Sequence, residues 1–362
     1  VPGGRVVVSA PRAGDWRAAD REDPLVVSRP PFGRMGSGRF VAVLLWWLWA
    51  LVLVIRHDVR FLHCGNVTPN GYVGYWMHRT LGLPYALYFH GMDVERFARK
   101  EARGGPRARV VRRILDRAAV VFANSRDTVA RLERIGVAGD RIRLLHPGVD
   151  AERFRPGPVN DPALAALADG PTLLTVGRYA RRKGVDLVLR ALVTVRRRVP
   201  CRLLVSGRDQ EENLRPLVDE LGLGDAVRFL GEVPAAALPD LYRAADVFVM
   251  PAREEADTGS VEGFGIVFLE AAASGVPAVG GRSGGMGDAV ADGETGFLVD
   301  PDDADGLAAR LLEILEDPEL AERLGRRGRE RALADFSWDR AGRIVGEEVR
   351  RAVDSAPSDR VG

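Results

Sequence analysis

The chain has 362 residues, of which 46% are hydrophobic and 28% are charged, and its formal net charge at pH 7 is +2. This length is sufficient for two domains with separate cores, and the composition is typical of a globular protein. A charge balance so close to zero gives no reason to expect a nucleic-acid partner. Cys64 and Cys201 lie far apart without metal-ligand spacing, so we expect a reduced, cytoplasmic protein without a disulfide framework.

The first half of the chain alternates short apolar runs with helical stretches. Four of these runs predict strands, at residues 5–10, 59–64, 85–90 and 119–123. Such alternation is typical of a parallel, doubly wound sheet covered by helices. The stiff, polar segment Arg155–Pro158 marks the best boundary, and we predict a first domain over residues 1–155.

Residues 40–55 form an uninterrupted apolar run. As a helix this run is roughly 24 Å long at ~1.5 Å per residue, which is short for a bilayer core of ~30 Å. Three interpretations stay open: a helix buried in the first domain, a helix that dips into a membrane or contacts a lipid acceptor, and a marginal membrane span. Trp46, Trp47 and Trp49 favour a membrane interface.

Residues 96–117 are strongly basic, with nine arginines or lysines against Glu101 and Asp116. One interpretation is a solvated helix face, and the other is a patch for an anionic membrane surface. Nucleic acid is not indicated, because no aromatic residues alternate with the charges. We therefore expect that residues 40–55 and 96–117 can make a peripheral contact with the inner face of the plasma membrane.

The second half shows the same alternation more clearly. Strands are predicted at residues 172–176, 202–206, 227–230, 247–250 and 277–279, and helices at 184–199, 211–221, 239–245 and 265–274. We assign residues 159–336 to this second doubly wound domain, followed by a last helix over residues 339–353. Ligands bind such sheets at the carboxyl ends of the strands, so the loops that follow these strands are expected to converge.

Two carboxylates eight positions apart, Glu262 and Glu270, bracket a glycine-broken turn and the start of a helix. Gly263 and Gly265 allow a close approach of the backbone to a ligand. The helix N-terminus that follows favours an anion. Glu270 lies about two turns along this helix among apolar residues, so it needs a polar partner. This combination is suited to a sugar joined to a phosphate.

Arg178 and Lys183 occupy a basic loop after the first strand of this half. An arginine can bind phosphate oxygens with two N–H groups, and a lysine adds a compact charge. Lys183 is one of only two lysines among 52 basic residues, the other being Lys100. His90 ends an apolar strand in the first half, where it can bind a sugar hydroxyl or serve a structural purpose.

No metal cofactor is expected. Asp300 and Asp302 form an Asp-x-Asp pair, which in other settings holds a metal with nucleotide-sugar phosphates. Here the pair precedes a helix, so we interpret it as helix capping. The chain contains neither a phosphate-binding P-loop nor a zinc-ligand spacing.

Several of these segments match a known family in its own order, across residues 146–301. They are residues 146–150, 176–184, 245–251, 262–277, 283–285 and 293–301. In them the chain resembles the retaining nucleotide-sugar glycosyltransferases of family 4, and most closely the mannosyltransferases that act at bacterial membranes. The resemblance implies the GT-B fold, which consists of two Rossmann-like α/β domains facing each other across a cleft.

The resemblance also implies roles for the residues above. The acceptor side is the first domain, onto which the last helix packs back, and the donor side is the second. Arg178 and Lys183 would hold the donor diphosphate. Residues Glu262, Gly263, Phe264 and Gly265 would contact the donor sugar, and Glu270 would bind the ribose. His90 would face the sugar from the first domain, with His90 and Glu262 as the catalytic candidates.

The expected reaction is transfer of a hexose, such as mannose, from a UDP- or GDP-sugar to a glycan or lipid-linked acceptor. A non-catalytic nucleotide-sugar-binding protein and a nucleotide-sugar epimerase of the same architecture remain as alternatives. Residues 3–11 resemble the second strand of the family rather than the first. We therefore expect the family's opening strand and helix to be missing from the chain as given.

Overall fold

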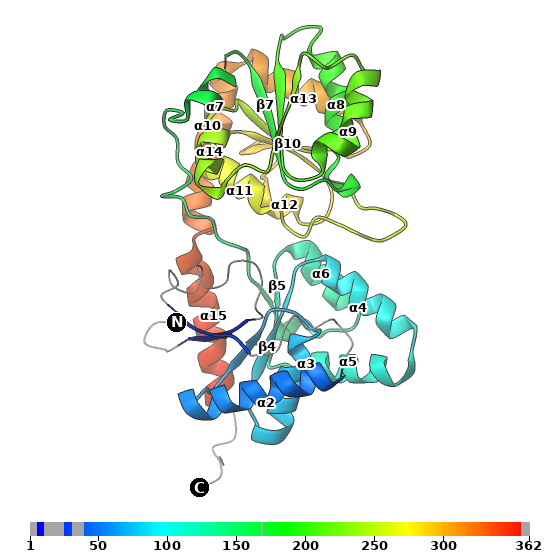
Figure 1. The fold of residues 1–362 in the computed structure, drawn as a ribbon, viewed down its shortest axis with the longest axis vertical. Coiled ribbons are helices and arrows are strands. Elements are labelled where there is room, and N and C mark those ends of the chain that lie inside the picture. The colour runs from blue at the N-terminus through cyan, green and yellow to red at the C-terminus, as the bar shows by residue number, and fades with distance from the viewer. Residues whose placement is uncertain (1–5, 11–24, 31–39, 168, 356–362) are drawn as a thin grey trace. The chain divides into compact units, whose positions relative to one another are not determined.

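The computed structural model describes residues 6–10, 25–30, 40–167 and 169–355. The chain forms two compact α/β units (Figure 1). The first comprises residues 1–124, 129–145 and 342–362, and the second comprises residues 125–128 and 146–341. The predicted α/β class with parallel sheets is confirmed, since every strand pairing among the named strands is parallel.

The main sheet of the first unit has the order β3-β4-β5-β6. Its strands are β3 (Leu62–Cys64), β4 (Tyr85–Phe89), β5 (Val120–Ala123) and β6 (Ile142–Leu144). A separate pair consists of β1 (Val7–Ser9) and β2 (Val26–Ser28). The helices are α2 (Phe40–His57), α3 (Asn70–Leu81), α4 (Met92–Ala102), α5 (Gly105–Arg117) and α6 (Arg126–Arg134). The apolar runs that predicted β4 and β5 form the buried centre of this sheet.

Helix α2 is buried along one side only. Ala50 and Val54 pack against Met77 of α3 and Leu83, whereas apolar side chains on the other side of α2 are exposed. The interpretation of residues 40–55 as a helix buried in the first domain therefore applies to one side of α2 only. Among the described residues, no helix has the length and apolar character that a membrane crossing requires.

The second unit is built on a six-stranded parallel sheet with the order β12-β11-β10-β7-β8-β9. Its strands are β7 (Thr172–Val176), β8 (Arg202–Ser206), β9 (Val227–Gly231), β10 (Val247–Met250), β11 (Ala278–Gly281) and β12 (Gly296–Val299). The chain first builds outward from β7 to β9 and then returns to the other side of β7. The strand order thus reverses between β7 and β10, where ligands bind in doubly wound sheets.

Helices cover both faces of this sheet, and neighbouring strand residues belong to opposite cores. In β7, Leu173 packs into the core under α8 (Val185–Val195), α9 (Gln210–Glu220) and α13 (Ala304–Glu316). Leu174 packs into the core under α10 (Leu238–Arg243) and α11 (Ile266–Ala273). Because both faces are buried, these strands appear in the sequence as continuous apolar runs.

The predicted last helix, residues 339–353, is present with nearly the same bounds. After α14 (Pro318–Asp335) the helix is interrupted at Phe336 and Ser337, and α15 (Trp338–Asp354) begins. The backbone N–H of Val149 donates to the carbonyl of Phe336 at 2.8 Å. From Gly342 onward α15 belongs to the first unit, where Glu348 accepts a hydrogen bond of 2.8 Å from Arg143.

Candidate active site

The loops that follow β7 and β10 meet at the point where the strand order reverses. Gly184 ends the first loop with φ +70°, and a Cβ atom there would lie 2.2 Å from the carbonyl oxygen of Pro251. Gly207, after β8, approaches the carbonyl oxygen of Gly177 as closely, since its Cβ would lie 2.0 Å away. Only glycine permits such close backbone contacts. The loops at the ends of neighbouring strands therefore lie against one another.

The loop before α11 is held by the loop after β11. The N–H of Gly285 donates to the carbonyl of Glu262 at 3.1 Å. A Cβ atom on Gly285 would lie 2.1 Å from the carbonyl oxygen of Gly263. The predicted convergence of the strand-end loops is therefore present within the second unit.

Lys183 and Arg178 differ in exposure. Arg178 is exposed, with its guanidinium near the carbonyl of Tyr179 at 3.4 Å. Lys183 is folded back on its own loop, and its Nζ lies 2.2 Å from the position that a Cβ on Gly177 would take. Burial lowers the pKa of Lys183; nearby Glu262 opposes this effect, and the positive charges of Arg182 and Arg178 reinforce it. A half-buried ammonium beside two arginines and a single carboxylate favours an anionic ligand.

Glu262 forms an ion pair with Arg182, with a distance of 3.4 Å between Oε2 and Nη2. Both side chains are largely buried, at 19% and 12% exposure. The backbone N–H of Arg182 donates to Glu255 at 3.0 Å, and its carbonyl accepts from the N–H of Arg253 at 2.7 Å. Arg182 therefore links the two loops of the site and orients the carboxylate of Glu262.

The sequence did not identify Arg182. It lies beside Arg181 in the same basic loop, and the residue types alone do not show which guanidinium points inward. In the structure Arg181 is exposed and Arg182 is largely buried. Arg181 and Arg182 differ in burial because the short helical turn Arg181–Lys183 directs successive side chains to different sides.

Glu270 has the polar partner that its surroundings demand. The hydroxyl of Tyr242 in α10 donates to Oε2 of Glu270 at 2.6 Å. Burial raises the pKa of Glu270, while the hydrogen bond from Tyr242 and the charge of Arg153 oppose that effect. No ion pair to Glu270 is formed within the described part of the chain, so Tyr242 is its principal support.

The turn between these carboxylates presents its backbone. Gly263, Phe264 and Gly265 are all buried, and Gly265 has φ +85° immediately before α11. The ring of Phe264 packs against His146, with 5.4 Å between ring centroids. Since that ring faces the core, Phe264 can offer a ligand only its main chain, beside the N–H groups that begin α11.

His90 belongs to the first unit. It follows β4, is exposed, and its ring centroid lies 4.4 Å from that of Tyr88. Its backbone N–H donates to Asp93 at 3.4 Å. The geometry of the donor-side cluster is contained in the second unit, and the role of His90 toward the donor sugar stays a prediction.

The acidic segment after β12 caps a helix. Asp303 accepts a hydrogen bond of 2.8 Å from the N–H of Gly306 in the first turn of α13, and Asp300 accepts one of 3.0 Å from the N–H of Asp302. Among the residues that the structure describes, no group of three or more His, Cys, Asp or Glu side chains could hold a metal ion.

Comparisons with known proteins decide the family. Residues 3–153 match the model of Glycosyltransferase Family 4, and residues 160–331 match that of Glycosyl transferases group 1. A GDP-mannose-dependent alpha-(1-6)-phosphatidylinositol monomannoside mannosyltransferase of Mycolicibacterium smegmatis is 36% identical over 300 residues, which cover 82% of this chain and 77% of the relative. The chain belongs to glycosyltransferase family 4.

Other relatives agree with this assignment. The glycosyltransferase is 33% identical over 305 residues to a D-inositol 3-phosphate glycosyltransferase of Streptomyces avermitilis, which covers 79% of this chain and 64% of that one. Its structure resembles a sucrose-phosphate synthase from Thermosynechococcus elongatus, with a TM-score of 0.78, 26% identity and coverage of 98% and 90%. A Rickettsia africae glycosyltransferase, at 18% identity and a TM-score of 0.82, shows the same fold over 98% and 92% of the two chains. The predicted GT-B fold and glycosyltransferase class are confirmed.

Proposed function

We propose that this glycosyltransferase moves a hexose from a nucleoside diphosphate sugar to a lipid-linked or glycan acceptor, with retention of the anomeric configuration. The observation that carries the proposal is the clustering of Lys183, Arg178 and Glu262 where the strand order reverses. Among donors we favour GDP-mannose over UDP-sugars, because the mycobacterial relatives are named as GDP-mannose-dependent. Their names also favour an inositol-containing lipid as acceptor.

The proposed mechanism places positive charge where the leaving diphosphate develops negative charge. Lys183, Arg178 and the first N–H groups of α11 would stabilise that charge, which is the largest contribution in many transfer reactions. Glu262 and the backbone of the turn after it would hold the donor sugar, and Glu270 would hold the ribose. His90 would hydrogen-bond the sugar from the first unit. This mechanism needs neither a metal ion nor a covalent sugar–enzyme intermediate.

Incubation of the purified protein with GDP-mannose and a phosphatidylinositol mannoside tests this proposal. We expect acceptor-dependent release of GDP and a product whose anomeric proton, by NMR, has the configuration of the donor. Parallel reactions with UDP-sugars test whether the donor nucleotide is GDP, as proposed, or UDP. Donor binding without transfer would favour the non-catalytic alternative, and donor isomerisation without an acceptor would favour an epimerase.

The lowered pKa of Lys183 predicts how donor binding depends on pH. The diphosphate favours the protonated amine, so GDP affinity should fall as the pH rises from neutral through the lowered pKa of Lys183. The decline should approach about tenfold per pH unit once the amine is mostly neutral. Calorimetric titrations across this range measure it.

The variant Lys183→Arg provides the control for this pH dependence. A guanidinium stays charged throughout the same range, so the variant should lose the alkaline decline even where its affinity at pH 7 is weaker. An identical decline in both proteins would show that another group titrates.

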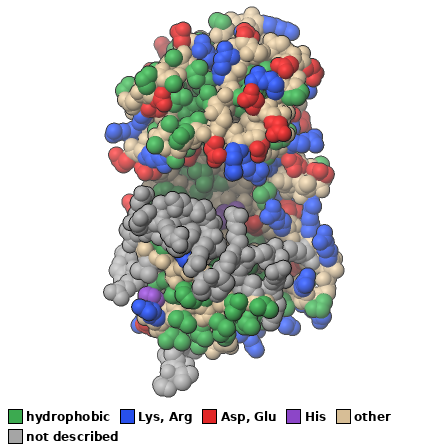
Figure 2. All heavy atoms as spheres, in the orientation of Figure 1, with side chains coloured by type: hydrophobic (Ala, Val, Ile, Leu, Met, Phe, Trp, Pro, Cys, Tyr) green, Lys and Arg blue, Asp and Glu red, His purple; other side chains and the backbone are tan. Residues whose placement is uncertain are grey.

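We also propose that the first unit contacts an anionic bilayer at the cytoplasmic face of the plasma membrane. Helix α2 carries an exposed apolar stripe, whose side chains are 36% to 73% exposed: Val41, Leu44, Leu45, Leu48, Val52 and Ile55. Their spacing of three and four residues places them along one side of the helix. Hydrophobic side chains gather over α2 in Figure 2.

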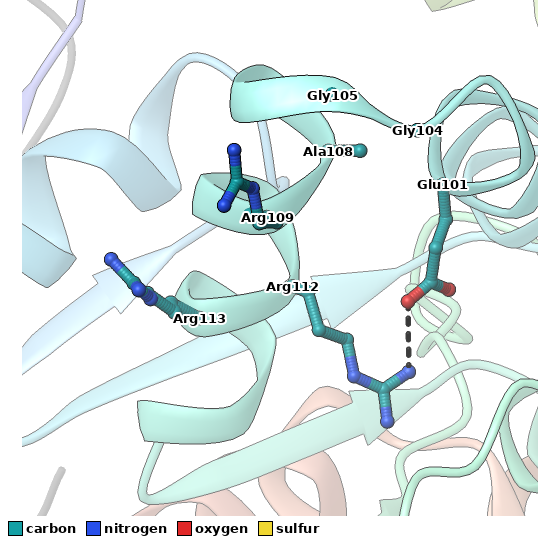
Figure 3. A pocket seen from close by; sticks show the side chains of 7 residues that line it. All are labelled: Glu101, Gly104, Gly105, Ala108, Arg109, Arg112 and Arg113. Atoms are coloured by element: carbon teal, nitrogen blue, oxygen red, sulfur yellow. Dashed lines mark hydrogen bonds and ion pairs between the residues drawn. The ribbon is translucent and has the colours of Figure 1, made fainter.

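Helix α5 adds positive charge to the same unit. Arg109, Arg112 and Arg113 line an open depression of about 470 Å³ at its N-terminal half (Figure 3). Arg112 is paired with Glu101 at 3.5 Å and Asp116 at 3.0 Å. The other two point away from Glu101, and neither forms an ion pair with a described residue. Because α3 packs against both α2 and α5, the stripe and these arginines flank one helix.

Vesicle co-sedimentation tests this contact. The double variant Leu48→Ser and Val52→Ser should weaken binding to phosphatidylcholine–phosphatidylglycerol vesicles by at least about tenfold, since each exposed aliphatic side chain contributes roughly 1.5–3 kcal/mol when buried. Replacing Arg109 and Arg113 by Ala should weaken binding only to the anionic vesicles, by about 1 kcal/mol per charge.

The control is Leu333→Ser, which alters a leucine that is 48% exposed on α14 of the second unit. Its vesicle binding should equal that of the unaltered protein. Equal losses in Leu333→Ser and in the α2 variant, or no loss in either, would contradict a membrane contact through α2.

A further inference from the structure

Tyr242 is a buried tyrosine whose hydroxyl has a defined partner. Its side chain is fully buried, and the hydroxyl donates to Oε2 of Glu270 at 2.6 Å. The ring packs against two phenylalanines, edge-on to Phe154 with 5.7 Å between centroids and tilted against Phe248 with 5.9 Å between centroids. The phenol can therefore neither turn away nor exchange its partner for water without disturbing the core.

The two oxygens of Glu270 have different environments. Oε2 accepts from Tyr242, and no described residue donates a hydrogen bond to Oε1. Glu270 itself is only partly buried, whereas Phe268 and Leu269 beside it are fully enclosed. A carboxylate that is fixed through one oxygen and open at the other is suited to accept hydrogen bonds from a ligand hydroxyl.

The hydrogen bond from the uncharged hydroxyl of Tyr242 affects the protonation of Glu270. Arg153, in the segment after β6, is the charged group that acts on Glu270, and it does so without a hydrogen bond to the carboxylate. Burial raises the pKa of Glu270, and the hydrogen bond from Tyr242 opposes the rise. Without the phenol hydroxyl, the carboxylate would protonate at a higher pH and would accept hydrogen bonds less well.

We propose that Tyr242 is a positioning residue, whose hydroxyl fixes one carboxylate oxygen of Glu270 so that the other is presented to the vicinal hydroxyls of the donor ribose. This inference rests on the proposed function, in which Glu270 binds the ribose. Tyr242 does not touch the substrate. It acts through Glu270, from a helix that lies 28 residues earlier in the chain.

The variant Tyr242→Phe removes a single oxygen and keeps the ring packing. We compare its binding of GDP with its binding of 2′,3′-dideoxy-GDP, which lacks the ribose hydroxyls. The unaltered protein should prefer GDP, and the variant should lose about tenfold in GDP affinity with little change for the dideoxy nucleotide, because a hydrogen bond to a charged group is at stake. As the pH is lowered, the variant should begin to lose GDP binding at a higher pH than the unaltered protein does, because its Glu270 protonates more readily.

The control is Tyr85→Phe in the first unit, which removes a buried hydroxyl that donates to the carbonyl of Ile114 at 2.5 Å. Both variants lose one buried hydrogen bond, so a merely structural effect would leave the GDP preference of each unchanged. Retention of the full preference in Tyr242→Phe would overturn the inference. If the unaltered protein binds GDP without preference over the dideoxy form, the ribose role of Glu270 fails instead.

Discussion

Replacing Lys183 by Ala is expected to lower kcat/KM for nucleotide-sugar turnover by about 10²–10³-fold, the usual cost of losing one preorganised group that stabilises developing charge. Lys183 lies against Gly177 at the carboxyl end of β7. Its amine is partly shielded from solvent and has Arg178 and Arg182 nearby. In the proposed complex its ammonium would therefore meet the diphosphate with little competing solvent. Steady-state kinetics with GDP-mannose and acceptor measure the effect.

Arg181→Ala is the matched control for this experiment. Arg181 belongs to the same helical turn and also carries one positive charge, but its side chain is exposed. Its removal should change kcat/KM by less than about threefold, because an exposed charge is strongly screened. Equal losses in the Arg181 and Lys183 variants would indicate a general electrostatic effect, and undiminished turnover in Lys183→Ala would contradict its assigned role.

Gly184→Ala is expected to be strongly destabilising for so small a change. The residue has φ +70°, and a Cβ atom would lie 2.2 Å from the carbonyl oxygen of Pro251. A backbone atom cannot swing aside as a flexible side chain can, so the loops after β7 and β10 must separate. We expect a loss of roughly 3–5 kcal/mol in the free energy of unfolding, together with weaker GDP binding.

The control variant Gly222→Ala separates the cost of backbone strain from the cost of the steric clash with Pro251. Gly222 has nearly the same backbone, φ +66°, but a Cβ atom there would meet nothing within 4 Å. Its cost should be only that of a left-handed alanine, about 1–2 kcal/mol. Urea denaturation of both variants measures the difference, and equal losses would show that the loop contact at Pro251 adds nothing to stability.

Local structure in the second unit could be predicted closely because its strands are buried on both faces. The strands at 172–176, 202–206 and 247–250 were predicted with the bounds that the structure shows. In the second unit β12 was missed, since it begins at Gly296. In the first unit β2 and β6 were missed, since each is only three residues long. Short or glycine-started strands lack the apolar run that makes a strand recognisable.

The chemical content of the candidate site was also accessible from the sequence. Glu262, Glu270 and Lys183 stand out because carboxylates and a rare lysine lie beside glycines at strand ends. Their supporting residues did not stand out. Arg182 looks like its neighbour Arg181, and Tyr242 lies in a helix with no visible relation to Glu270. The membrane question was left open for a similar reason, since an apolar run does not reveal which side of α2 is covered.

The sequence by itself determined the α/β class, the positions of most of the buried strands and a set of candidate side chains for binding a sugar and a diphosphate. These features depend on residues near one another in the chain, where hydrophobic patterning and glycine placement act directly. The tertiary structure alone decided which side chains support them. The strand order brings β10 beside β7 across more than seventy residues, and only this pairing sets Glu262 on Arg182. Such contacts depend on the order of the strands in the sheet, which cannot be predicted from the local amino-acid composition.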